Sequence, residues 1–238
     1  MPAHNIALSL VIPAYNEAQR LPPYLASVRI HLDASYGKDY EVIVVDDGSD
    51  DGLAEILEAS ARDWPQLRRL KHDENRGKGA AVRTGVLASL GDLVLFADAD
   101  GATPIEEQGK LAEAIRGGAD IAVGSRLVAA ADVNRSRARG LAGRLFAAVA
   151  GRLLRMPVHD TQCGFKMFRG EAARRLFSLA REPRYLFDLE VLALATKLGY
   201  RTCEVPIRWQ EMPGGHLQLV RDLPGILLNL WRLRRRLA

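Results

Sequence analysis

Residues 93–101, Leu-Val-Leu-Phe-Ala-Asp-Ala-Asp-Gly, join an apolar strand to an acidic turn. Alternate residues of an extended segment face the same way, so Asp98 and Asp100 leave the strand end side by side, and Gly101 frees the chain to turn. Paired carboxylates suit a magnesium or manganese ion that keeps positions open for phosphate oxygens. An acidic pair in a turn also occurs as a solvated loop or a helix cap. We interpret this stretch as a metal-assisted site for a phosphate-bearing ligand.

Two further apolar runs also end in polar residues. Residues 8–12 stop at Pro-Ala-Tyr-Asn-Glu (13–17), and residues 42–45 stop at Asp-Asp-Gly-Ser-Asp-Asp (46–51). Ligands of an open parallel sheet bind beyond the carboxyl ends of its strands, so we expect the three strand ends to line one crevice. As an alternative, Asn16 or Glu17 caps the helix after the first strand, and Asp50 or Asp51 caps the helix after the second.

The order of apolar runs predicts an α/β fold. Expected strands are 6–12, 41–45, 67–71, 92–97 and 119–123, and the helices between them are 17–33, 51–62, 78–90 and 104–116. This alternation indicates a mainly parallel sheet with helices on both faces. After Arg126 the pattern changes to an arginine-rich loop, a helix at about 139–155, the segment 160–168, short helices at about 170–180 and 188–198, a strand at 201–207 and a terminal amphipathic helix.

Composition fits a single large domain that meets an anionic partner. The 238 residues are 48% hydrophobic and 26% charged, with a net charge of +4. Arginines cluster between residues 126 and 155, where only Asp132 opposes them, and again at 232–236. Such clusters mark a solvated face or an anionic partner. Two cysteines without metal-ligand spacing indicate a reducing cytosol. The absence of a signal segment and of about 20 consecutive apolar residues predicts a chain that is neither exported nor membrane-spanning.

Six strings, in the expected order and spacing, resemble the family 2 glycosyltransferases that load a sugar onto a polyprenyl phosphate. They are VIPAYNE (11–17), VVDDGSDDG (44–52), NRGKGAAVRTG (75–85), ADADGATP (97–104), GSR (124–126) and DTQCGFKMF (160–168). ADADGAT and DTQCGFK are most similar to the dolichyl-phosphate glucosyltransferase branch. The resemblance implies a GT-A type nucleotide-sugar fold with one domain, 1–238. Within it, about 1–125 form the nucleotide-sugar half, about 126–220 the acceptor half, and 221–238 an amphipathic tail.

The resemblance also assigns roles to residues. The nucleotide-sugar is implied to contact Pro13, Tyr15, Glu17, Val45, Asp47, Asp98, Ala99 and Asp100. The string Gly77-Lys78-Gly79 itself places Lys78 either near the phosphates at a helix start or in a plain surface turn. Asp100 is implied to be the main metal ligand, with Asp98 beside it, and the cofactor is Mg²⁺ or Mn²⁺. Arg126, Gln162, Lys166 and His216 are implied to face the acceptor or the sugar.

Three positions leave the site open to question. Relatives of the mannosyl branch often carry a Gln metal ligand where this chain has Ala102, so the metal would use water, phosphate or Thr103. His216 stands where relatives frequently have a lysine in a loop that closes over the donor. Asp160 and Asp188 are possible auxiliary bases, although a cap or an ion pair is the simpler role for each.

The implied reaction is an inverting transfer. A lipid monophosphate is largely dianionic at neutral pH, so its oxygen attacks the anomeric carbon without a strong base. Asp98, Asp100 and Arg126 are the expected catalytic residues, and an α-linked UDP-sugar, with glucose favoured, gives a β-linked lipid-phosphate sugar. A GDP-mannose-dependent mannosyltransferase is the alternative within the family.

Other classes fit less well. A dinucleotide-binding dehydrogenase places G-x-G-x-x-G directly after its first strand, and a nucleotidyltransferase also has a Gly-rich loop there, whereas this chain has Pro-Ala-Tyr-Asn-Glu. An anionic-surface or nucleic-acid-binding protein on the same fold is suggested by the arginines, but aromatic residues are not interleaved with them, so we expect no nucleic-acid partner.

The expected location is cytoplasmic and peripheral, at the cytoplasmic face of the membrane. In helix 139–155 an apolar face (Leu145, Phe146, Val149, Leu153) opposes an arginine face, as in helices that lie on an anionic leaflet. Packing of this helix on the domain core is the alternative. Residues 222–237 could supply a second anchor or a dimer contact, and the sequence leaves the oligomeric state open.

Overall fold

The computed structural model describes residues 6–128, 131–134, 156–212 and 233–236. Its strands are β1 Leu8–Ala14, β2 Tyr40–Asp46, β3 Leu67–Lys71, β4 Leu93–Ala97, β5 Ile121–Ser125, β6 Asp132–Asn134, β7 Phe165–Arg169, β8 Thr202–Pro206 and β9 Arg208–Gln210. Its helices are α1 Leu21–Tyr36, α2 Leu53–Arg62, α3 Lys78–Leu87, α4 Gln108–Arg116, α6 Gly170–Leu179 and α7 Phe187–Lys197, and the short 3-10 helix η1 Ile105–Glu107 precedes α4. The predicted helix at 139–155 and most of the predicted tail lie outside the described residues.

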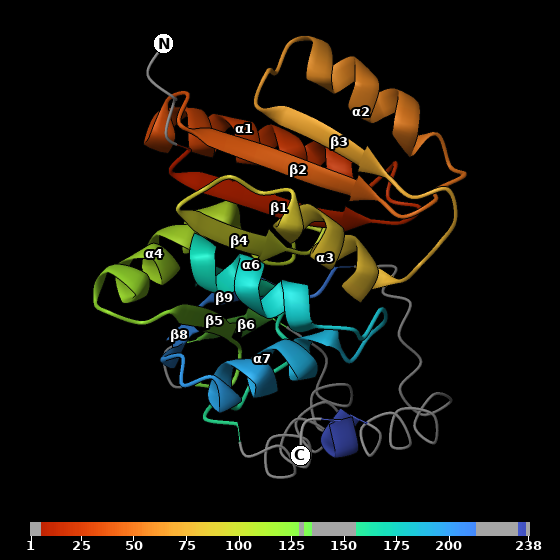
Figure 1. Cartoon of the computed structure of the whole chain (residues 1–238). Helices are drawn as coiled ribbons and strands as arrows, with labels where there is room; N and C mark the ends of the chain where they lie inside the picture. The colour runs from red at the N-terminus through yellow and green to blue at the C-terminus, as the bar shows by residue number, and fades with distance from the viewer. Residues whose placement is uncertain (1–5, 129–130, 135–155, 213–232, 237–238) are drawn as a thin grey trace, which may run out of the picture.

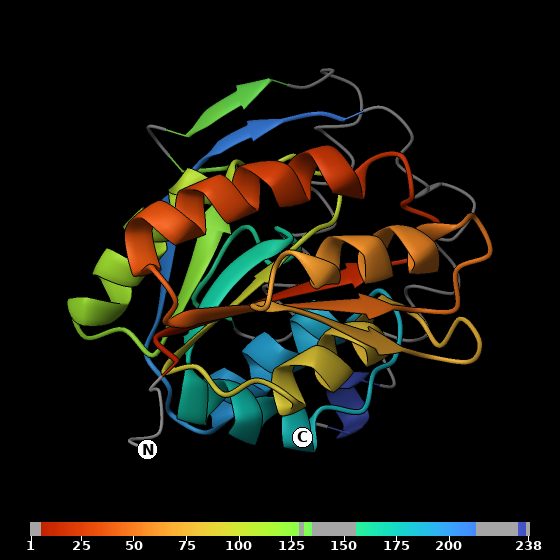
Figure 2. The same cartoon turned by 90° about the horizontal axis from the view of Figure 1, so that it is seen from above.

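A seven-stranded sheet forms the centre of the molecule, in the order β3-β2-β1-β4-β7-β5-β8 (Figure 1). All its pairings are parallel except those of β7 with β4 and with β5. The predicted mainly parallel sheet is therefore confirmed. A second sheet, formed by β6 and β9 in parallel, lies beyond α1 (Figure 2).

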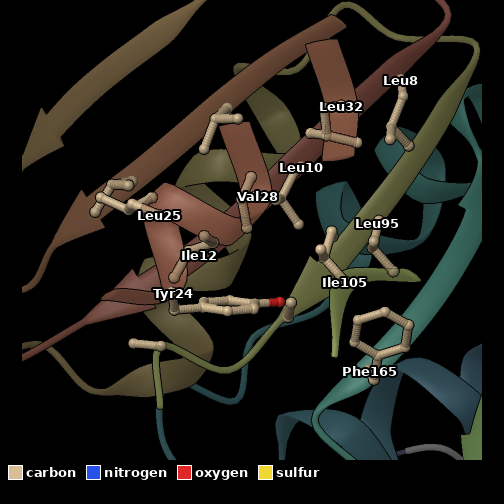
Figure 3. Packing of buried hydrophobic residues seen from close by; sticks show 14 of the residues in the cluster. Leu8, Leu10, Ile12, Tyr24, Leu25, Val28, Leu32, Leu95, Ile105 and Phe165 are labelled. Atoms are coloured by element: carbon tan, nitrogen blue, oxygen red, sulfur yellow. The ribbon is translucent and has the colours of Figure 1, made fainter. Parts of the chain in front are cut away.

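Helices cover both faces of the large sheet, as predicted. Along β1 the side chains alternate: Leu10 and Ile12 belong to a cluster with α1, α2 and α4, whereas Val11 packs with α3, α6 and α7. Figure 3 shows the first cluster, in which Leu25, Val28 and Leu32 of α1 lie over the sheet. Since every residue of β1 and β2 is buried, these strands read as continuous apolar runs in the sequence.

The sequence reading missed the central strand β7, and also the short strands β6, which lies in the predicted arginine-rich loop, and β9. β7 pairs antiparallel with β4 and β5 at once, so that Lys166 faces both Phe96 and Val123 in register. A lysine in a short segment does not suggest a central strand. Here its side chain is only 1% exposed, and its ammonium donates to Asp188 Oδ1 and to the carbonyl of Cys163, each at 2.5 Å. This buried ion pair joins β7 to α7.

Removal of the Asp188 carboxylate is predicted to destabilise the fold. Asp188→Ala leaves the Lys166 ammonium buried without its anion, which costs about 3–5 kcal/mol of unfolding free energy. The double variant Lys166→Met/Asp188→Leu is expected to recover most of that loss because it replaces the pair by apolar contacts. Urea unfolding at neutral pH measures both variants, with the exposed Glu113→Ala as the matched control. A loss below about 1 kcal/mol in Asp188→Ala, the size of a surface pair, would contradict this role.

Candidate active site

A cavity of about 410 Å³ opens at the carboxyl ends of β1, β2 and β4. It is lined by Pro13, Ala14, Tyr15, Glu17, Arg20, Asp47, Asn75, Gly77, Lys78, Ala81, Asp98, Ala99 and Asp100. The three polar strand ends thus meet in one crevice, as expected from the sequence. All the residues predicted to hold the nucleotide-sugar are in this lining except Val45, which is fully buried in a small cluster with Ile43 and Ala81. Arg20 and Asn75 were not predicted, although Asn75 is the first residue of the third string and Arg20 follows the first string closely.

Hydrogen bonds join the loop after β1 to the loop after β2. The backbone N–H of Asn16 donates to Ser49 Oγ (3.0 Å), and the Asn16 side-chain oxygen accepts from the N–H of Asp50 (3.1 Å). Asp51 accepts from the N–H of Ala18 (2.8 Å) and from that of Leu53, the first residue of α2 (3.2 Å). Asp51 therefore holds the loop that carries Tyr15 and Glu17. The expected side-chain capping is not observed, because the N-cap residues of α1 and α2 are Arg20 and Gly52, and neither helix has a side-chain cap hydrogen bond.

Asp47 supports the floor of the cavity. Its Oδ2 accepts from the N–H of Gly77 (2.8 Å), and its Oδ1 accepts from the N–H of Arg76 (3.0 Å) and lies 2.6 Å from His72 Nδ1. The side chain is 2% exposed. Asp47 thus fixes the chain just before α3, and its oxygens are already used by protein donors.

Lys78 is the first residue of α3 and faces the acidic pair. Its ammonium lies 2.6 Å from Asp98 Oδ1 and 5.3 Å from the ring centroid of Phe96. Burial alone would lower the pKa of Lys78, but the negative charges of Asp98 and Asp188 outweigh that effect and raise the pKa. Glycine is required on both sides of Lys78, because a Cβ at Gly77 or Gly79 would lie within about 2.6 Å of backbone carbonyls in the segment 182–184.

Gly164 holds Asp98 in place. The N–H of Asp98 donates to the Gly164 carbonyl (3.0 Å), and a Cβ on Gly164 would lie 2.0 Å from Asp98 Oδ2. The glycine of the DTQCGFK string is therefore dictated by contact with the ADADG string.

In the described part of the chain, Asp100 forms no ion pair like the one that joins Lys78 to Asp98. Its Oδ1 accepts from the N–H of Ala102 (3.0 Å). Burial and then the nearby negative charge of Asp98 raise the pKa of Asp100. A carboxylate in this state favours a cation beside it.

The residues present fit a divalent metal that is completed by its substrate. No group of three or more His, Cys, Asp and Glu side chains within the described ranges would hold an ion by protein ligands alone. Mg²⁺ is commonly bound through one or two carboxylates together with substrate phosphates and water, and Asp98 and Asp100 supply such a pair. Ala102 offers no ligand atom from its side chain.

Arg126 is held by Asp160. Its Nε donates to Asp160 Oδ2 and its Nη2 to Oδ1, both at 2.8 Å, and its backbone N–H donates to Oδ2 at 2.9 Å. Burial would raise the pKa of Asp160, but the hydrogen bonds and charge of Arg126 outweigh it and lower the pKa. The guanidinium also lies over the Trp209 ring, 5.3 Å from its centroid. Asp160 thus forms an ion pair with Arg126, and Asp188 forms one with Lys166. These ion pairs are the simpler role considered for both residues in the sequence analysis.

A second, smaller cavity of about 60 Å³ also borders the acidic pair. It is lined by Tyr24, Asp98, Asp100, Ala102, Thr103, Arg126, Gly164, Phe165 and Trp209. Asp98 and Asp100 belong to both linings, so the two cavities meet at these carboxylates. Neither Tyr24 nor Trp209 stood out in the sequence, because each looks like an ordinary core or strand residue.

Three predicted acceptor-side residues are not in either lining. Lys166 is buried beneath the site, as described above. The Gln162 side-chain nitrogen is buried and finds no hydrogen-bond partner in the described part of the chain. His216 lies outside the described residues.

The end of the tail contacts α7. Leu233 is fully buried, and Arg236 forms ion pairs with Glu190 (3.2 Å) and Glu182 (3.8 Å). Among the helices in the described ranges, none has the length and apolar character needed to cross a membrane.

Comparison with known proteins agrees with the fold. The family model for glycosyl transferase family 2 matches residues 9–177. The chain is 37% identical to the dolichyl-phosphate beta-glucosyltransferase of Dictyostelium discoideum, over 98% of this chain and 79% of that protein. It is 40% identical to a dolichyl-phosphate beta-glucosyltransferase of Trichomonas vaginalis, over 97% of this chain and 74% of that protein.

A solved structure shows the same fold. Glucosyl-3-phosphoglycerate synthase from Mycobacterium tuberculosis, in complex with Mn²⁺, UDP and glucosyl-3-phosphoglycerate, superimposes with a TM-score of 0.70 and 21% identity, over 96% of this chain and 79% of that chain. The predicted GT-A type fold is thereby confirmed. With the matched family model and relatives of this identity, the chain belongs to glycosyltransferase family 2 and is a glycosyltransferase similar to the dolichyl-phosphate beta-glucosyltransferases.

Proposed function

We propose that the protein transfers glucose from UDP-glucose to a polyprenyl phosphate of the dolichyl type, with inversion, to give a β-glucosyl lipid phosphate and UDP. The observation that carries the proposal is the pair Asp98 and Asp100, which lines both the larger cavity and the smaller one. The names of the two relatives described above supply the sugar and the lipid phosphate.

The larger cavity suits the nucleoside diphosphate. Its volume of about 410 Å³ is in the usual range for small-molecule sites. Tyr15 is 44% exposed at its edge, where an aromatic ring can contact the base. Lys78 stands at the N-terminus of α3, and helix N-termini favour phosphate. We propose that, when the donor binds, the Lys78 ammonium leaves Asp98 and forms an ion pair with the diphosphate.

Asp100, with Asp98 beside it, would hold the divalent metal, Mg²⁺ or Mn²⁺. Such an ion, when bound, stabilises the negative charge that develops on the departing diphosphate. The solved relative that contains Mn²⁺ and UDP supports a divalent ion in this fold.

Arg126 orients the attack. The lipid phosphate needs no strong base, because it is largely dianionic at neutral pH. Asp160 accepts hydrogen bonds from Nε and Nη2 of Arg126 and so fixes the plane of the guanidinium. The remaining N–H groups of the guanidinium can then donate to an anion without a loss of side-chain freedom on binding. Asp160 is therefore a positioning residue in this proposal, and the burial of Asp188 against Lys166 gives it a structural role.

In this proposal the two halves of the chain have different ligands: residues 1–125 bind the donor and residues 126–220 face the acceptor. The halves are nevertheless in contact, because the N–H of Asp98 donates to the carbonyl of Gly164. Because the acceptor is a lipid, we propose that the protein works as a peripheral protein at the cytoplasmic face of a membrane, held there in part by its arginine clusters.

The donor prediction is tested by competition. With UDP-glucose and GDP-mannose at equal concentration and polyprenyl phosphate as acceptor, we expect glucosyl transfer to dominate, because the most similar relatives carry that activity in their names. Radiolabelled product is separated by thin-layer chromatography and its anomeric configuration read by NMR. Preferential mannosyl transfer would show that the protein is a GDP-mannose-dependent mannosyltransferase instead. If no sugar is transferred to any lipid phosphate, the proposal is refuted.

The metal prediction concerns Asp100. EDTA should abolish transfer, Mg²⁺ or Mn²⁺ should restore it, and Asp100→Asn should lower kcat by about a hundredfold or more, since it removes charge from the proposed ion ligand. The exposed Asp63→Asn, far from both cavities, is the matched control and should keep its activity. Circular dichroism must show that Asp100→Asn is folded. Full activity in the folded variant would exclude Asp100 as the main metal ligand.

A further inference from the structure

The hydroxyl group of Tyr24 is left unexplained by the fold and by the proposed catalysis. The side chain is 7% exposed, and its ring packs on Gly101, where a Cβ would lie 3.1 Å from the ring. Among the described residues, no hydrogen-bond partner lies within reach of the hydroxyl oxygen. An unpaired buried hydroxyl costs stability, so a phenylalanine would serve better if packing were the sole purpose.

Tyr24 belongs to the lining of the small cavity. Figure 3 shows its oxygen pointing away from the backbone of α1, toward the side on which Phe165 lies, and Phe165 is part of the same lining. The cavity volume is about 60 Å³. Since a cavity of roughly 10–15 Å³ already holds one water molecule, this space admits a hydroxyl-bearing edge of a sugar ring.

The groups around the small cavity suit the hydroxyls of a sugar. Asp98 and Asp100 supply carboxylate oxygens that accept from hydroxyl groups, and Tyr24 and Thr103 supply hydroxyls that pair with them. Trp209 and Phe165 offer apolar surface to the ring carbons.

The wall that carries Trp209 is fixed to the acidic loop. The N–H of Gln210 donates to the carbonyl of Ala102 (2.9 Å), two residues beyond Asp100. Arg208 Nε donates to the buried Glu107 (2.6 Å). The residues on either side of Trp209 therefore hold it in register with Asp100, which is a property of a preorganised subsite.

We propose that the small cavity is the specificity subsite for one edge of the donor hexose, in which the hydroxyl of Tyr24, assisted by Thr103, pairs with a sugar hydroxyl. The inference rests on the proposed function for the identity of the donor. A buried hydroxyl that only the correct sugar satisfies gives selectivity, because a donor that lacks the partner group leaves Tyr24 unpaired.

Tyr24→Phe tests the subsite, because it removes one oxygen and keeps the ring. Steady-state transfer is measured with UDP-glucose and with the UDP-linked 2-, 3-, 4- and 6-deoxyglucoses. We expect kcat/KM for UDP-glucose to fall roughly three- to tenfold, the worth of one net hydrogen bond, and to stay unchanged for the deoxy donor that lacks the partner hydroxyl. The dissociation constant of UDP and the melting temperature should not worsen. Tyr36→Phe, on the same helix with its hydroxyl bonded to Gln108 at 2.8 Å, is the matched control and should leave every kcat/KM unchanged.

Two outcomes would overturn the subsite: an equal loss for all donors together with weaker UDP binding, or no loss for any donor. Calorimetry with Mn²⁺ and no acceptor separates this inference from the proposed function. Wild-type protein that binds UDP-glucose no more tightly than UDP would refute the subsite. Tighter binding of UDP-glucose that Tyr24→Phe weakens, without transfer to any lipid phosphate, would refute the proposed function and leave the subsite standing.

Discussion

The contact between Gly164 and Asp98 is the constraint on which the site depends. The carbonyl of Gly164 accepts a hydrogen bond from the N–H of Asp98, and the space beside the Asp98 carboxylate has no room for a Cβ at position 164. The contact exists because β7 enters the sheet antiparallel next to β4, which brings the second half of the chain to the strand end that carries the acidic pair. Arg126 and Phe165 reach the same place through that insertion. One close backbone approach thus joins the first half of the chain to the second.

Three ion pairs lie near the centre of the molecule: Lys78 with Asp98, Arg126 with Asp160, and Lys166 with Asp188. Asp100 forms no such pair with any residue that the structure describes, and its pKa is raised, with burial as the main cause. Paired charges hold loops in fixed positions, whereas an unbalanced carboxylate between two cavities provides affinity for an incoming cation. The fold therefore prepares the point at which the proposed metal and diphosphate would meet.

Much of this arrangement could be predicted from the sequence. Buried parallel strands are continuous apolar runs, so β1, β2 and β4 and the polar residues at their ends were visible, and so was the crevice that they share. What escaped prediction depends on contacts distant in sequence. β7 hides a buried lysine whose partner is 22 residues away, and Tyr24 and Trp209 reach the acidic pair from elements that carry no motif. The roles of Val45 and Asp47 were also hard to foresee, because burial of Val45 and the use of Asp47 by three protein groups appear only in the fold.

The central claim is that Asp98 and Asp100 stand between the nucleotide and the sugar. A crystal structure of the protein with UDP-glucose and Mn²⁺ tests it most directly, since the anomalous signal of manganese locates the ion independently of the model. The account predicts manganese bound to a carboxylate oxygen of Asp100 and to the diphosphate, uracil in the cavity beside Tyr15, and an edge of glucose in the cavity beside Tyr24. Manganese bound elsewhere, or a nucleotide on the Trp209 side of the acidic pair, would contradict it.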